Sequence, residues 1–209
     1  MGISIVVMYV DDMLIVGNEE SIKNLSRELE KVFNITVEEE MTDYLGCEFK
    51  TDKEGNKAWL GQANVVKSLK DKFGYLVEEL KFPKTPGTTG LSVVKPEETD
   101  LISEEDQTLY RSGTGILLYL TKHSRPDISS PTRELSKVMD GASKMHMKEL
   151  LRIIKFVMMT PDMGLKFKPK NKNGTWQLRA LSDSDFASDK DSRRSVTGFV
   201  VYFLGVPIS

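Results

Sequence analysis

Two adjacent carboxylates, Asp11 and Asp12, are the residues of this sequence best suited to bind a metal ion. Runs of β-branched and apolar residues flank them, over 5–10 on one side and 13–16 on the other. Such runs favour two short buried strands, so we expect both acids at the tip of a tight hairpin. Like charges this close repel one another unless a cation lies between them. Oxygen-only ligands suit a hard cation such as Mg²⁺.

Each acidic group of the sequence also has a simpler interpretation. Asp is a common turn residue, so the first pair could be a solvated turn. A second acidic stretch, with Asp183, Asp185, Asp189 and Asp191, could bind Ca²⁺ or Mg²⁺. Spacing alone favours a solvated loop there. The residue types by themselves leave both alternatives open.

Composition excludes several classes of site. The 209 residues are enough for one large domain or two small ones, and 39% are hydrophobic, which permits a core. A single cysteine, Cys47, excludes an internal disulfide and a cysteine-cluster zinc site. Only His123 and His146 are present, so a histidine-built metal site is not expected. No signal peptide or membrane-spanning run is recognisable, which predicts an intracellular protein.

Charge is divided unevenly along the chain. The net charge of −2 does not indicate a nucleic-acid-binding protein. Residues 1–110 hold 12 Lys and Arg against 22 Asp and Glu, whereas residues 111–209 hold 17 against 9. An acidic half beside a basic half is consistent with a metal-bearing part and a phosphate-contacting part. Ordinary variation of surface charge explains the same asymmetry.

Periodicity predicts the elements that position these residues. In the first half we expect a helix over 21–33 with Ser21 as N-cap, a strand over 35–39, a hairpin of 44–49 with 58–60, and a helix from Gln62 to Phe73 ended by Gly74. A proline- and glycine-rich stretch, 82–98, predicts a linker.

Three helices are expected after this linker. The first begins with a capping box at Ser103, and its Gly113 and Gly115 predict close packing. The second reaches Met139, and the third runs from about His146 to Met159. The tail then changes to strands, expected over 164–168, 176–181 and 198–204, with a turn at 171–174 joining the first two.

Motifs in this order resemble the polymerase polyprotein of copia-type LTR retrotransposons. The tetrapeptide Tyr-Val-Asp-Asp at 9–12 resembles motif C of reverse transcriptases. Further similarities follow along the chain: Tyr44-Leu45-Gly46-Cys47-Glu48-Phe49, Leu60-Gly61-Gln62, Tyr110-Arg111-Ser112, Ser124-Arg125-Pro126-Asp127-Ile128, Ser182-Asp183-Ser184-Asp185-Phe186-Ala187 and Asp191 to Phe199. Together they cover nearly the whole chain, although Gly61 replaces the usual Ser.

The resemblance implies an α+β fold in three parts. Residues 1–60 would form a partial reverse-transcriptase palm, with the motif C hairpin, the motif D helix and a hairpin that holds the primer end. Residues 61–163 would form a helical thumb-like region containing the linker. Residues 164–209 would be the first strands of an RNase H-like domain.

The resemblance also implies site residues and ligands. Asp11 and Asp12 would be catalytic metal ligands in the palm, and Asp183 would be a metal ligand of RNase H. The metal would be Mg²⁺ or Mn²⁺, and the substrates would be dNTPs on an RNA or DNA template–primer. Nucleic-acid contacts are expected from Tyr9, Tyr44, Leu45, Gly46, Lys148 and Arg152.

Departures from the family pattern predict that this chain does not polymerise by itself. Reverse transcriptases need a third palm carboxylate from a strand before motif C, and the chain starts eight residues before Tyr9. Of the RNase H carboxylates, only Asp183 is matched. A fragment or decayed copy is therefore expected, and a second polypeptide could supply the missing half. The alternatives are a non-catalytic nucleic-acid-binding or interaction remnant, and an unrelated Ca²⁺-binding protein using 183–191.

Overall fold

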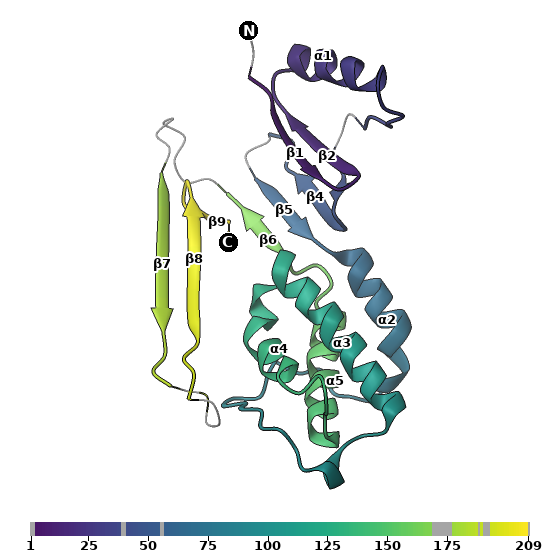
Figure 1. The fold of residues 1–209 in the computed structure, drawn as a ribbon, viewed down its shortest axis with the longest axis vertical. Helices are drawn as coiled ribbons and strands as arrows, with labels where there is room; N and C mark the ends of the chain where they lie inside the picture. Colours follow the sequence, from purple (N-terminus) through teal and green to yellow (C-terminus); the bar gives the residue numbers. More distant parts are fainter. Residues whose placement is uncertain are drawn as a thin grey trace.

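In the part of the chain that the structure describes, the fold combines five α-helices with three small antiparallel sheets (Figure 1). The computed structural model describes residues 3–38, 41–54, 57–168, 177–187, 189 and 193–208. This mixture of elements agrees with the α+β class predicted from the sequence. No helix in these ranges has both the length and the apolar character needed to cross a membrane.

The first sheet is the predicted hairpin around the two acids. Strand β1 (Ile5–Tyr9) pairs antiparallel with β2 (Asp12–Val16), and these two strands form a sheet by themselves. The expected burial of the strands is wrong: every residue of β1 is exposed, and β2 is at most half-buried. The apolar side chains of β1 are therefore open to solvent, with Ile5 58% and Met8 69% exposed.

The helix after the hairpin starts earlier than predicted. Helix α1 (Glu19–Glu30) is capped by Asn18 and not by Ser21, since the Asn18 Oδ1 accepts a hydrogen bond from the Ser21 backbone N at 2.8 Å. An Asn side chain is as good an N-cap as Ser. The strand expected over 35–39 is also wrong, because residues 34–38 have no regular structure; Glu39 lies outside the described residues.

The second sheet has four strands in the order β3-β4-β5-β6. Its members are β3 (Asp43–Tyr44), β4 (Cys47–Thr51), β5 (Ala58–Gly61) and β6 (Leu165–Phe167). The predicted hairpin is confirmed in part, as β4 with β5. The single strand expected over 44–49 is wrong, because the chain turns at Leu45 and Gly46 and β3 pairs back onto β4. Strand β6 pairs with β5, with Leu165 opposite Leu60. The strand expected over 164–168 is thus confirmed as β6, and the turn predicted at 171–174 lies outside the described residues.

Four helices enclose the hydrophobic core (Figure 1). They are α2 (Ala63–Val77), α3 (Glu104–His123), α4 (Ser129–Ser136) and α5 (Lys144–Met159). Gly74 does not end α2, because Val77 continues the helix into the core and is fully buried there. Helix α4 stops at Ser136, three residues before the predicted end at Met139, although Val138 is still buried in the core.

The proline-rich stretch 82–98, here called the strap, lies against these helices. Thr88 Oγ1 donates a hydrogen bond to Glu149 of α5, and the buried backbone N of Val93 donates to Glu134 Oε2 of α4 at 3.3 Å. A short 3₁₀ helix, Glu98–Asp100, follows before α3. The strap is irregular, as predicted, but its contacts attach it to the helical core.

A buried arginine, Arg125, connects the turn after α3 to the end of α5. Arg125 precedes a 3₁₀ turn, Pro126–Ile128, and its side chain is 1% exposed. Its guanidinium donates two hydrogen bonds of 2.9 Å to the Asp127 carboxylate and two more to Thr160, which follows α5. This fork satisfies a buried charge at the end of α5; breaking such a pair typically costs about 3–5 kcal/mol.

The third sheet is exposed over most of its two long strands, although Val206 of its last strand is buried. It contains β7 (Leu178–Ser184), β8 (Thr197–Phe203) and β9 (Val206–Pro207) in that order. All residues of β7 are exposed, and those of β8 become half-buried only near its end. Figure 1 shows this long hairpin beside the helical region rather than within it.

Candidate functional site

The two adjacent acids lie at the tip of the first hairpin, as predicted. Tyr9 and Asp12 face each other across the strands, so Val10 and Asp11 form the two-residue turn. Both carboxylates are exposed. Val10 has a φ of 52°, a left-handed conformation that a β-branched residue seldom adopts. Such strained residues occur preferentially at functional sites.

Neither acid has the ligands of a complete metal site around it. Within the described ranges, no three His, Cys, Asp or Glu residues lie together in a way that could hold a metal ion. Asp11 and Asp12 therefore offer two adjacent carboxylates for a hard cation without a third one from the described residues.

A second tight turn lies in the segment expected to hold a primer end. Leu45 and Gly46 connect β3 to β4, with φ values of 52° and 67°. The Leu45 carbonyl accepts a hydrogen bond of 2.7 Å from the Tyr119 hydroxyl of α3. A Cβ on Gly46 would lie 2.9 Å from the same hydroxyl oxygen. Glycine therefore serves here both the turn conformation and the close approach of α3.

Tyr119 of α3 contacts the turn that holds three of the predicted binding residues, Tyr44, Leu45 and Gly46. Burial raises the pKa of Tyr119, with further contributions from Cys47 and Tyr9, so its hydroxyl keeps the proton that it donates to Leu45. The hydrogen bond to Leu45 places the β3–β4 turn against Tyr119. The hydroxyl of Tyr44 is buried and has no hydrogen-bond partner among the described residues.

Tyr119 and His123 were not predicted as site residues. Their rings meet edge to face, with centroids 4.7 Å apart. The pKa of His123 is lowered by burial and, to a smaller extent, by Lys122. The spacing of four residues places both rings on one face of a helix, and this is the signal that the sequence carried. Their contact with the β3–β4 turn has no signal in the local pattern.

The acids of the C-terminal stretch are not gathered into one site. Asp183 is exposed on β7 opposite Gly198, on a different sheet from Asp11 and Asp12. Asp185 Oδ1 accepts a hydrogen bond from the Val196 backbone N at 2.8 Å, and Asp189 pairs with Lys137 at 2.9 Å. Asp191 lies outside the described residues. The described members thus have separate partners, which gives no support to a Ca²⁺ site.

The two predicted phosphate contacts on α5 differ in their surroundings. Lys148 is exposed. Arg152 is half-buried, and its Nη2 donates to the Thr85 carbonyl and hydroxyl oxygens at 3.3 and 3.2 Å. Arg152 therefore fastens the strap to α5, whereas the Lys148 ammonium is open to solvent.

Comparison with known proteins identifies the relatives of this chain. An alignment of 211 positions, which covers all of the chain, is 35% identical to the Retrovirus-related Pol polyprotein from transposon RE1 of Arabidopsis thaliana. The chain is 28% identical over 98% of its length to the corresponding polyprotein from transposon TNT 1-94 of Nicotiana tabacum. These matches span only 14% and 15% of the two polyproteins.

A shorter relative matches over most of its own length. The uncharacterized mitochondrial protein AtMg00810 of Arabidopsis thaliana is 30% identical over 96% of this chain and 79% of that protein. No family model and no solved structure matches the chain. Because several transposon polyproteins match it over nearly all of its own length, the chain belongs to the family of copia-type retrotransposon Pol polyproteins and corresponds to a segment of them.

Proposed function

We propose that this chain is the part of a retrotransposon reverse transcriptase that carries the motif C carboxylates, continued into the start of RNase H. The observation that carries the proposal is the hairpin tip, where Asp11 and Asp12 are adjacent and exposed beside the strained Val10. The similarity of the whole chain to a segment of Pol polyproteins supports it.

In the intact parent enzyme, Asp11 would be the main metal ligand and Asp12 its supporting partner. Bound Mg²⁺ or Mn²⁺ would lower the barrier to attack of a primer hydroxyl on a nucleotide phosphate. The β3–β4 turn with Tyr44, Leu45 and Gly46 would lie along the primer end. Asp183 would serve a second, RNase H site.

The 209 residues by themselves do not polymerise in this proposal. Two carboxylates from one hairpin, without a third from the described residues, bind Mg²⁺ weakly. Primer extension by the purified chain is expected to be absent. Extension that is abolished by Asp11→Asn would overturn this part of the proposal.

Metal binding at the hairpin tests the assignment of the site. Titration with Mn²⁺ should broaden the amide NMR signals of Val10, Asp11 and Asp12 before those of other residues. Asp11→Asn should remove this effect. Asp71→Asn, which changes an exposed acid on α2, is the matched control and should leave it intact. Equal broadening in both variants would contradict the assignment.

The second candidate is a non-catalytic remnant that binds nucleic acid. The lack of a third carboxylate beside Asp11 and Asp12 among the described residues and the basic second half of the chain favour it. Salt-sensitive binding of a template–primer that survives Asp11→Asn, together with no Mn²⁺ effect at the hairpin, would favour this candidate over the first.

A further inference from the structure

A cavity of about 590 Å³ lies between the strap, α4 and the segment that leads into β8. Its charged lining residues are Lys95, Arg133, Lys137, Asp189 and Arg194. Four cations from three distant segments of the chain thus surround one cavity with a single carboxylate among them. The lining therefore has an excess of positive charge, and such an excess in a cleft attracts anions.

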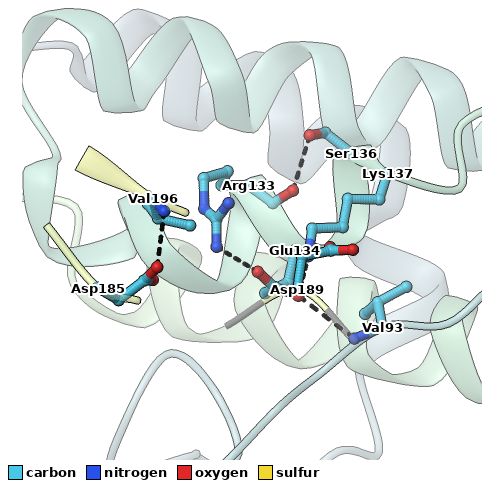
Figure 2. Close-up of polar contacts among 8 residues, drawn as sticks. All are labelled: Val93, Arg133, Glu134, Ser136, Lys137, Asp185, Asp189 and Val196. Carbon is cyan, nitrogen blue, oxygen red and sulfur yellow. Dashed lines mark hydrogen bonds and ion pairs between the residues drawn. The ribbon is translucent and has the colours of Figure 1, made fainter. Parts of the chain in front are cut away.

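A carboxylate behind the cavity fixes two of these cations (Figure 2). Glu134 is 10% exposed and is not part of the lining. Its Oε1 accepts a hydrogen bond from Arg133, and its Oε2 pairs with Lys137 at 3.0 Å and with the Val93 backbone N. Both Glu134 oxygens are therefore occupied, and they orient the two cations of α4.

Lys137 remains charged in this setting. Burial by itself would lower the pKa of Lys137, but its contacts with Asp189 and Glu134 together raise that pKa above its ordinary value. The ammonium lies 2.9 Å from Asp189 Oδ2 and 3.0 Å from Glu134 Oε2. Lys137 therefore attaches the segment before β8 to α4 and contributes positive charge to the cavity.

The other two cations are held more loosely. Lys95 pairs with Asp140 at 2.9 Å, but both side chains are about 70% exposed, and such surface pairs contribute little stability. Arg194 is exposed, and its guanidinium has no ion-pair partner among the residues that the structure describes. These two side chains are thus able to turn towards an incoming anion without breaking a buried contact.

We propose that this cavity binds a phosphate group of a nucleic-acid backbone, with Arg194 and Lys95 as direct contacts and Arg133 in support. The proposal rests on the proposed function, since a nucleic acid is the polyanion that a Pol segment would meet. Arginine matches phosphate oxygens with two parallel hydrogen bonds. Contacts of this kind position a duplex without reading its sequence.

The test measures how the chain binds a short RNA–DNA hybrid at several salt concentrations. Arg194→Gln and Lys95→Gln should each lower the slope of log affinity against log salt concentration by about one. Arg27→Gln is the matched control, because Arg27 is an exposed arginine on α1, away from the cavity lining. This variant should keep the wild-type slope.

A second arm separates the sources of phosphate. Inorganic pyrophosphate is titrated while the backbone amide NMR signals of Arg133, Lys137 and Arg194 are followed. Saturable shifts that are lost in Arg194→Gln support a phosphate site. If such shifts occur but the chain does not bind the hybrid, the cavity binds a free phosphate ligand rather than a nucleic-acid backbone, and the proposal is overturned.

The remaining outcomes are also distinct. Hybrid binding with an unchanged slope in both cavity variants overturns the cavity proposal and leaves the proposed function standing. Absence of binding to both hybrid and pyrophosphate overturns the cavity proposal, and the Mn²⁺ titration at the hairpin then decides the proposed function separately.

Discussion

The helical region and the first hairpin contain apolar residues of similar kinds but bury them to opposite extents. Ile153 of α5 is fully buried in the core, whereas Ile5 of β1 is 58% exposed. The helices pack against one another around a shared core, whereas none of the buried core residues that the structure describes comes from β1 or β2. The difference indicates that stability resides in the helices and that the acids are carried by a peripheral element.

The largest effect is expected from one substitution made in both regions. Ile153→Ala removes buried methyl groups from the core and should lower the free energy of unfolding by about 2–5 kcal/mol. Ile5→Ala should change it by no more than about 0.5 kcal/mol, because its side chain is already exposed. Urea unfolding followed by circular dichroism measures both. Equal losses would show that the hairpin is buried in solution and would remove the contrast.

Two glycines on α3 provide a sharper comparison inside the helical region. A Cβ on Gly113 would lie 3.1 Å from atoms of Leu150 and Phe73, whereas a Cβ on Gly115 meets no atom within 4 Å. Gly113→Ala should therefore cost about 1–3 kcal/mol through overpacking, less the gain in helix propensity. Gly115→Ala should stabilise the chain by roughly 0.5–1 kcal/mol. Thermal unfolding distinguishes them, and a stabilised Gly113→Ala would show that α3 and α5 are loosely packed.

These glycines also show what sequence reasoning reaches. The sequence pattern predicted close packing at both glycines. The structure confirms it for Gly113, which lies against side chains of α2 and α5, but not for Gly115, where an added Cβ would meet no atom within 4 Å. The Ser103 cap, the β4–β5 hairpin and the tip position of Asp11 and Asp12 were predicted, since each depends on local residue types.

Features that depend on distant segments were missed. The pairing of β6 with β5 and the hydrogen bond from Tyr119 to Leu45 join residues that are far apart in the chain. The exposure of β1 depends on which other elements pack against it. Hydrophobic periodicity reports which face of an element is apolar, but not which partner covers that face. The sequence therefore predicts the two acids at the hairpin tip, but not the contact of α3 with the β3–β4 turn.

The smallest expected effect is a pH dependence that arises inside the helical region. His146 is 2% exposed at the start of α5, and its Nδ1 accepts a hydrogen bond of 3.1 Å from the Ser143 backbone N. Its Nε2 is buried and has no partner among the described residues. Burial lowers the pKa of His146 below its ordinary value of 6.5. Folding therefore disfavours the protonated form of this imidazole.

The sign of the effect follows from this direction. Below about pH 6.5 the unfolded chain takes up a proton at residue 146 that the folded chain resists, so the stability present above that pH is lost as pH falls through the folded pKa. The slope from one such group is at most about 1.4 kcal/mol per pH unit.

His146→Gln removes the titrating group, and Gln at this position can still complete the capping box with Ser143. Urea unfolding at about pH 7.5 and 5.5 should show a flatter acid limb for His146→Gln than for the wild type. His123→Gln, which alters a less buried histidine beside Tyr119, should flatten it less. An unchanged limb in His146→Gln would show that the buried imidazole does not control the acid stability of the helices.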